Sequence, residues 1–212
     1  MMGSIKKPAF SLDIQSCTGC KTCMVACKDK NDLAAGIRWR RVVEYVGGDW
    51  IRLPDGTFRQ NVFGYYISVS CNHCSDPVCV EGCPTGAMNK DENGIVSVAH
   101  SLCMGCRYCE WSCPYSAPQY YEGLGQMTKC DMCRDELEQG GLPACVAACP
   151  TRALGLLEIG ETLNEVSDHT NVAPLPEEEY TSPNFVVNPS RTCQPVGSEA
   201  GKIANPEEIK DA

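Results

Sequence analysis

The stretch CTGCKTCMVAC, residues 17–27, recurs as CMGCRYCEWSC at residues 103–113. In both copies a glycine precedes the second cysteine and a basic residue follows it. A repeat of this kind indicates that one structural unit occurs more than once in the chain. An aromatic content of 7% and 19 glycines offer little material for a large apolar core. We therefore expect the chain to be organised around its cysteines.

A second pair of motifs lies between and after the first pair. CNHCSDPVCVEGCP at residues 71–84 resembles CDMCRDELEQGGLPACVAACP at residues 130–150, with a proline two residues before the third cysteine and Cys-Pro at the end. We number the motifs one to four in chain order. Motifs two and three are neighbours and motifs one and four flank them. This order predicts an α+β fold of two nested bacterial-type 2×(4Fe-4S) ferredoxin-like units.

The spacing of the cysteines is typical of iron–sulfur proteins. C-x2-C-x2-C lets one loop direct three thiolates at a 4Fe-4S cluster, while a fourth cysteine three residues later, before proline, ligates the neighbouring cluster in two-cluster ferredoxins. Zinc ribbons instead use two separated C-x2-C pairs for one metal. A disulfide framework needs an oxidising compartment, and 17 cysteines is an odd number. We therefore favour iron–sulfur clusters over zinc and over disulfides.

Cross-pairing of the nested motifs gives four expected ligand sets for four 4Fe-4S clusters. The sets are Cys17, Cys20, Cys23 and Cys149; Cys130, Cys133, Cys145 and Cys27; Cys71, Cys74, Cys79 and Cys113; and Cys103, Cys106, Cys109 and Cys83. Cys193 is left over as a non-ligand thiol. Motif one departs from the pattern because Lys28, not proline, follows Cys27. This weakens the argument for an exit turn there and leaves the ligand assignment intact.

The rest of the chain suggests how the units are bounded. The expected parts are an outer unit of residues 1–37 and 125–156, an inserted hairpin region of residues 38–66, an inner unit of residues 67–124, and a tail of residues 157–212. Residues 88–98 indicate a turn between short strands, and short helices are expected to carry the fourth cysteine of each motif. The acidic, proline-rich tail is either frayed and extended or wraps a partner.

Composition and motifs exclude several function classes. The net charge of −9 leaves no basic footprint for nucleic acid. We find no secretory signal and no apolar run of about 20 residues that could span a membrane. No dinucleotide fingerprint, phosphate loop or nucleophile–base pair is recognisable. The sequence therefore predicts a non-catalytic protein that stores and passes electrons, with no catalytic residues.

A few side chains next to the cysteines invite specific hypotheses. Lys21 and Arg107 either raise the reduction potential of nearby clusters or are solvated surface charges. Tyr108 and Trp111 are expected to shield a cluster. His73 is expected to be a hydrogen-bond donor or a surface residue, since sulfur fills the ligand positions. We assign no role to His100 or His169.

Beyond the cysteines, several segments give the chain a wider resemblance. They are Tyr45-Val-Gly-Gly-Asp-Trp50, Asn61-Val-Phe, Ser70-Cys-Asn-His-Cys, Cys113-Pro-Tyr-Ser-Ala-Pro-Gln-Tyr120, Met127-Thr-Lys-Cys, Val172-Ala-Pro-Leu-Pro and Ala204-Asn-Pro. With the motifs, these resemble the four-cluster ferredoxin-like subunits of molybdopterin oxidoreductases, in particular those serving reductases of dimethyl sulfoxide and related S- or N-oxides. The resemblance covers nearly the whole chain.

The resemblance implies a place in a respiratory complex. It implies a heterotrimer in which an integral membrane subunit oxidises quinol and a molybdopterin subunit reduces the acceptor in anaerobic respiration. It also implies co-export on a partner's twin-arginine signal, and a position at the periplasmic face of the bacterial cytoplasmic membrane. By the same resemblance, the Cys103 cluster lies towards the quinol and the Cys17 cluster towards the molybdenum. The alternatives are a free polyferredoxin or the equivalent subunit for selenate, thiosulfate or another acceptor.

Overall fold

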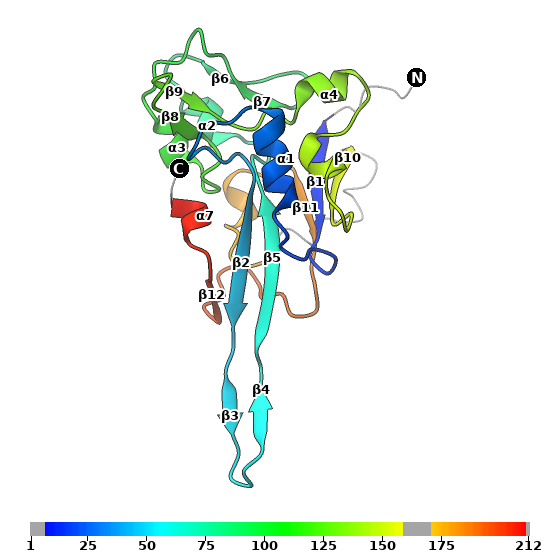
Figure 1. The fold of residues 1–212 in the computed structure, drawn as a ribbon. Helices are drawn as coiled ribbons and strands as arrows, with labels where there is room; N and C mark the ends of the chain where they lie inside the picture. The colour runs from blue at the N-terminus through cyan, green and yellow to red at the C-terminus, as the bar shows by residue number, and fades with distance from the viewer. Residues whose placement is uncertain (1–6, 159–170, 211–212) are drawn as a thin grey trace.

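The computed structural model describes residues 7–158 and 171–210 as a mixed α/β fold with short helices (Figure 1). The strands are β1 (Pro8–Asp13), β2 (Arg41–Gly47), β3 (Trp50–Arg52), β4 (Phe58–Gln60), β5 (Phe63–Val69), β6 (Met88–Lys90), β7 (Val96–Val98), β8 (Gln119–Tyr121), β9 (Gln126–Thr128), β10 (Leu154–Glu158), β11 (Phe185–Asn188) and β12 (Gly201–Ile203). The helices are α1 (Thr22–Lys30), α2 (Val78–Glu81), α3 (Tyr108–Ser112), α4 (Arg134–Glu138), α5 (Ala144–Ala147) and α7 (Glu207–Lys210), with a 3-10 turn, η1 (Glu178–Tyr180).

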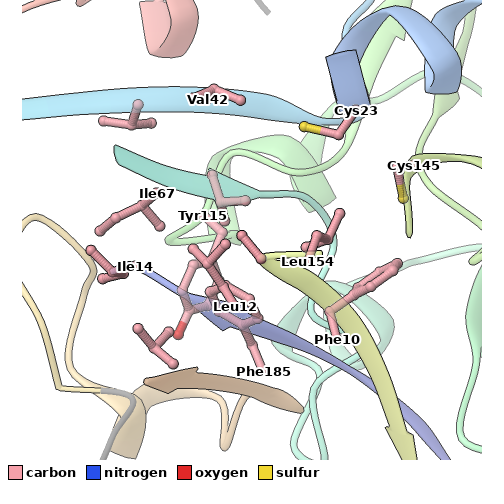
Figure 2. Close-up of a cluster of buried hydrophobic side chains, with 14 of the residues drawn as sticks. Phe10, Leu12, Ile14, Cys23, Val42, Ile67, Tyr115, Cys145, Leu154 and Phe185 are labelled. Carbon is pink, nitrogen blue, oxygen red and sulfur yellow. The ribbon is translucent and has the colours of Figure 1, made fainter. Parts of the chain in front are cut away.

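Two three-stranded sheets enclose the main apolar core. In one, β1 lies between an antiparallel β10 and a parallel β11; in the other, β2 lies between β12 and β5, both antiparallel. Both faces of the central strands are largely covered, since the consecutive residues Val42 and Val43 of β2 are both buried in this core. Figure 2 shows Phe10 and Leu12 of β1, Ile67 of β5 and Phe185 of β11 meeting between the sheets. Cys23 and Cys145 lie at the margin of this core, so packing fixes the cysteine loops.

The hairpin of β2 and β5 extends well beyond the body of the molecule (Figure 1). Its far end is the two-stranded ribbon of β3 and β4. Trp50, Ile51 and Phe58 are exposed on this ribbon. The inner half of the hairpin carries the buried residues Val43 and Ile67, so only that half is anchored in the core.

Short hairpins occupy the region between motifs two and four. β6 pairs with β7 around Asp91 and Gly94, which confirms the expected turn between short strands. β8 pairs with β9 in the same way. Met88, Val96 and Met127 from these hairpins form a second, smaller core with Cys79 and Cys109. The smaller core thus supports Cys79 and Cys109, whereas Cys71 of motif two packs in the main core.

The helices lie elsewhere in the motifs than we expected. α2, α3 and α5 hold the third cysteine of motifs two, three and four and end before the fourth, so the expectation that helices carry the fourth cysteine is wrong there. The cause is the proline after Cys83, Cys113 and Cys149, because the residue before proline avoids the helical region. Cys113 accordingly has φ −80° and ψ 114°. Only α1, which has Lys28 in place of proline, continues through its fourth cysteine to Lys30.

The described part of the tail, residues 171–210, folds back over its own chain. β11 adds a strand beside β1, and β12 adds one beside β2. Ser75 and Asp76 of motif two donate backbone hydrogen bonds to Ser182 and Thr181 of the tail. The expectation of a frayed tail is therefore wrong for these residues, and wrapping of a partner stays a prediction. Residues 159–170 and 211–212 of the expected tail, with His169, lie outside the described residues.

Candidate iron–sulfur cluster sites

The loops of motifs one and three have the same backbone conformation. Gly19 and Gly105 adopt φ of 68° and 71°, and Lys21 and Arg107 adopt φ of 61° and 63°. A Cβ on Gly19 would lie 2.5 Å from the Tyr66 ring, and one on Gly105 would lie 2.2 Å from the Gly125 carbonyl oxygen. Glycine is therefore needed for both the left-handed turn and the close approach. The sequence repeat is a repeat of cysteine-presenting loops.

The fold gathers the cysteines into four groups, each drawing on two motifs. Site 1 is Cys17, Cys20, Cys23 and Cys149; site 2 is Cys27, Cys130, Cys133 and Cys145; site 3 is Cys71, Cys74, Cys79 and Cys113; site 4 is Cys83, Cys103, Cys106 and Cys109. Within each group the thiolates are close enough to raise one another's pKa electrostatically. Electrostatic interactions also link Cys23 with Cys145 and Cys130 with Cys71, so neighbouring groups lie close to one another and the division into four ligand sets stays a prediction.

Two of the groups visibly line cavities. Site 1 surrounds a cavity that also touches Leu12, Val42 and Leu154, and site 4 surrounds one bordered by Met88, Met127 and Tyr108. Among the described residues, no three cysteine, histidine or carboxylate side chains stand close enough to share a single metal ion. The thiols are therefore arranged around a space.

Backbone amides and hydroxyls point at the sulfurs in a repeated pattern. The N–H groups of Met88 and Leu154 donate to Cys83 Sγ and Cys149 Sγ at 3.3 and 3.5 Å. Thr85 and Thr151 place a hydroxyl 3.7 and 3.8 Å from the same sulfurs. Although burial acts to raise the pKa of Cys83 and Cys149, these donors lower it below the ordinary thiol value. The residues after Pro84 and Pro150 therefore stabilise a thiolate, whereas at Cys113 burial outweighs the backbone donors and raises the pKa.

Most of the other thiols are buried and favour the protonated form. Burial raises the pKa of Cys27, Cys74, Cys79 and Cys109 to about 12. A metal binds the thiolate, so it must displace these protons. Cys20 and Cys106 are exposed, whereas all four cysteines of site 2 are buried. The groups therefore differ strongly in their access to solvent.

The side chains next to the cysteines differ in part from our expectations. Lys21 and Arg107 are paired surface charges: Lys21 lies 2.6 Å from Glu208, and Arg107 lies 2.6 Å from Glu110. Tyr108 lines the cavity of site 4, as a shielding role requires. Trp111 is 75% exposed, so shielding by Trp111 within this chain is wrong.

His73 is fully buried, so the expectation of a surface residue is wrong. Its backbone N–H donates to Cys71 Sγ at 3.5 Å, while its ring Nδ1 accepts a hydrogen bond from the Val96 N–H at 3.0 Å. Burial, followed by the charge of Lys129, lowers its pKa well below the ordinary value, so the ring is neutral. Cys193, by contrast, lies outside the four groups and bonds only with Ser190 among the described residues, at 3.3 Å from the backbone N–H and 3.4 Å from the hydroxyl.

Sequence reasoning missed two adjacent buried arginines, Arg40 and Arg41. Each is 2% exposed. Arg41 Nη2 donates to the Tyr115 carbonyl at 2.6 Å, on the side of Cys113. Burial acts to lower the pKa of Arg40, yet electrostatic interaction with the cysteines of sites 1 and 2 outweighs burial and raises it. The basic run Arg38-Trp-Arg-Arg in an otherwise balanced body was the signal available in the sequence.

Comparison with known proteins identifies the family of the chain. The 4Fe-4S dicluster domain family matches residues 62–159. The B subunit of anaerobic dimethyl sulfoxide reductase from Escherichia coli is 50% identical over 200 residues, which cover 94% of this chain and 97% of that protein. The chain belongs to this B-subunit family. The Haemophilus influenzae member is 48% identical over 94% of this chain and 98% of its own length.

Membership of the B-subunit family defines the class of protein. The chain is an iron–sulfur electron-transfer protein of an oxidoreductase system and has no catalytic role of its own. A more distant relative, the thiosulfate reductase electron transfer subunit PhsB of Salmonella typhi, is 40% identical over 71% of this chain and 75% of that protein. No helix within residues 7–158 and 171–210 has the length and hydrophobicity of a membrane span.

Proposed function

We propose that the chain holds four 4Fe-4S clusters and relays electrons from a quinol-oxidising membrane subunit to a molybdopterin subunit that reduces dimethyl sulfoxide or a related S- or N-oxide. The observation that carries the proposal is the gathering of sixteen cysteines into sites 1 to 4. Each site offers four sulfur donors, the ligand set of a 4Fe-4S cluster. The acceptor follows from the relatives' names.

The spacing of the thiols fits a cluster. In a 4Fe-4S cluster each thiolate binds a different iron, so the four sulfurs stand further apart than around one ion. This matches groups of thiols arranged around a cavity without three ligands close enough to share one ion among the described residues. The amide and hydroxyl donors at Cys83 and Cys149 match the hydrogen bonds that cluster sulfurs receive.

Neighbouring sites are linked in sequence by pairs of cysteines. Cys23 of site 1 interacts with Cys145 of site 2, and Cys130 of site 2 interacts with Cys71 of site 3. Cys109 of site 4 lies in α3, and Cys113 of site 3 directly follows the end of this helix. The order is therefore 1, 2, 3 and 4, with the exposed cysteines at the two ends. Electrons would enter at site 4 and leave at site 1.

The chain's own residues hold and insulate this line. Each bound cluster supplies one-electron oxidation and reduction. Val42 and Leu154 at site 1, and Met88 and Met127 at site 4, exclude water from the sulfurs. Leu102, Met104 and Trp111, which lie in or next to motif three, are exposed and offer an apolar surface for the membrane subunit.

The two nested units are part of the proposal. α1 packs against α5 and β1 pairs with β10, which joins motifs one and four. α2 packs against α3, which joins motifs two and three. We assign residues 1–37 and 125–156 to the outer unit, residues 67–124 to the inner unit, residues 38–66 to the projecting hairpin, and residues 157–212 to a tail that contributes to the partner interface. The assembled complex would lie at the periplasmic face of the cytoplasmic membrane.

The cluster count is tested by iron and acid-labile sulfide analysis of anaerobically purified protein, followed by EPR during stepwise reduction. About sixteen irons with interacting signals from reduced clusters are expected for four 4Fe-4S clusters. Eight irons or fewer in fully loaded protein would overturn the four-cluster arrangement. Co-purification with a molybdenum-containing subunit and a membrane subunit is expected; a chain that purifies alone from its native membrane would be a free polyferredoxin.

The ligand sets are tested by a matched pair of substitutions in motif two. Cys83→Ser is expected to damage the cluster of site 4, because Cys83 lies with Cys103, Cys106 and Cys109. Cys79→Ser is expected to damage site 3 instead. EPR-monitored redox titration of both variants distinguishes the two clusters by their reduction potentials. If both variants damaged the same cluster, the cross-pairing would be wrong.

A further inference from the structure

Arg40 is a buried cation without a carboxylate partner. Its guanidinium donates to the Ser68 carbonyl at 3.3 Å, the Ser68 hydroxyl at 3.2 Å and the Ser70 hydroxyl at 2.9 Å. Its Cζ lies 4.3 Å from the centre of the Phe10 ring. Within the described chain, no carboxylate lies at ion-pair distance from Arg40, and its Nε has no hydrogen-bond partner. An isolated buried charge is costly, so an anion must compensate it.

The groups that face Arg40 are cysteines from two different sites. Cys23 of site 1, and Cys145, Cys130 and Cys27 of site 2, interact electrostatically with the guanidinium. Ser68 connects Arg40 to site 1 directly, since its hydroxyl lies 3.3 Å from Cys23 Sγ and also accepts a hydrogen bond from Arg40. The Arg40 cation therefore lies between sites 1 and 2, and Ser68 connects it to site 1 through hydrogen bonds.

We propose that Arg40 sets the reduction potentials of the clusters at sites 1 and 2, and lessens the repulsion between them when both are reduced. The inference rests on the proposed function, because it requires clusters at both sites. A cluster bound by four thiolates carries net negative charge, and reduction adds one more. A fixed cation in a low-dielectric interior favours the more negative state and so raises the potential. Arginine suits this role because it stays protonated.

Arg41, the first residue of β2, directly follows Arg40 and provides a matched control. Its guanidinium donates to the Tyr115 carbonyl and faces Cys113 of site 3. The two arginines are equally buried and equally charged. They differ in the cysteine group they face, so their effects on potential should separate by site.

The test is an EPR-monitored redox titration of the intact holoprotein, or of its complex, with Arg40→Gln, Arg40→Lys and Arg41→Gln. Signals are assigned to sites by Cys145→Ser for site 2 and Cys20→Ser for site 1. Arg40→Gln is expected to make reduction at sites 1 and 2 at least tenfold less favourable, about 59 mV for one electron. Arg40→Lys is expected to stay within about threefold of the wild type by the same conversion. Arg41→Gln should shift site 3 alone.

The outcomes separate cleanly. Full iron content with unchanged potentials at sites 1 and 2 in Arg40→Gln overturns the inference, as does an equal shift in Arg40→Lys. If Arg40→Gln loses iron, the Arg40→Lys variant separates the two explanations. Normal iron content and normal potentials in Arg40→Lys support the need for a positive charge at this position. Loss of clusters in Arg40→Lys as well overturns the inference. Failure of the proposed function gives a different result, because the wild-type protein itself would then lack reducible clusters at sites 1 and 2.

Discussion

Replacing Lys28 with proline would make motif one match the Cys-Pro ending of the other three motifs. The structure predicts that this change destabilises the protein. In the wild type, α1 runs through Cys27 to Lys30. Lys28 Nζ also donates to the carbonyls of Leu33 and Ala34 at 2.9 and 2.7 Å, which holds the loop after the helix. Proline removes both the helical N–H and the ammonium group.

The magnitude follows from these two losses. Proline in a helix interior costs about 3 kcal/mol, because it loses a hydrogen bond and clashes with the preceding turn. The ammonium bonds lie at the surface and contribute about 0.5–1 kcal/mol. Lys28→Ala loses only the second part and is the matched control. The difference between the two variants, about 3 kcal/mol, corresponds to roughly a 100-fold change in the equilibrium for opening α1.

Hydrogen–deuterium exchange of the holoprotein, followed on the peptide that covers α1, measures this opening directly. Exchange in Lys28→Pro should be roughly 100-fold faster than in Lys28→Ala. The peptide covering β6 and β7, whose Met88 and Val96 pack in the smaller core, should exchange equally in both. Equal protection of α1 in the two variants would refute the argument that motif one needs an uninterrupted helix.

Two further predictions concern the tail. Asn205→Ala should speed proteolysis of the C-terminal segment, because Asn205 pairs with the Glu44 N–H and the Val42 carbonyl at 2.8 Å each. Leaving the Glu44 N–H and the Val42 carbonyl unpaired costs about 2–4 kcal/mol of stability. The exposed Asn188→Ala control should change the rate of proteolysis little. Tyr65→Phe should cost about 1–3 kcal/mol in urea unfolding near neutral pH, because the hydroxyl donates to the Ala173 carbonyl at 2.6 Å. Burial raises the pKa of Tyr65 to about 12, so stability that is complete below about pH 10 falls as pH rises towards 12, and this fall should be smaller in Tyr65→Phe.

Local spacing in the sequence was enough to predict the cysteine-presenting loops. C-x2-C-x2-C places three thiols on one loop whatever surrounds it, and the repeated Gly19 and Gly105 reflect the same backbone turn. The proline rule also works, since Cys113 leaves the helical region before Pro114. We applied that rule to the direction of the fourth cysteine and failed to apply it to the helix, which must end there for the same reason.

Long-range features could not be read from the sequence. β11 pairs with β1 across most of the chain length, and its four residues carry no periodicity that distinguishes them from an extended tail. The burial of Arg40 depends on β5 and on the thiols of two distant motifs, so nothing local separates it from a surface arginine. His73 becomes an acceptor only because β7 brings the Val96 N–H against it.

The pairing of the first strand with one of the last has a consequence for synthesis. The expected ligands of sites 3 and 4 end at Cys113 and the smaller core at site 4 is complete at β9, which ends at Thr128, whereas site 1 is expected to need Cys149 and its supporting sheet needs β11, which ends at Asn188. The 60 residues from 128 to 188 take roughly 3–12 s to translate at bacterial and eukaryotic rates. The inner half of the molecule is therefore ready to receive iron and sulfide while the outer half still waits on the ribosome, so the two halves are completed in a fixed order in time.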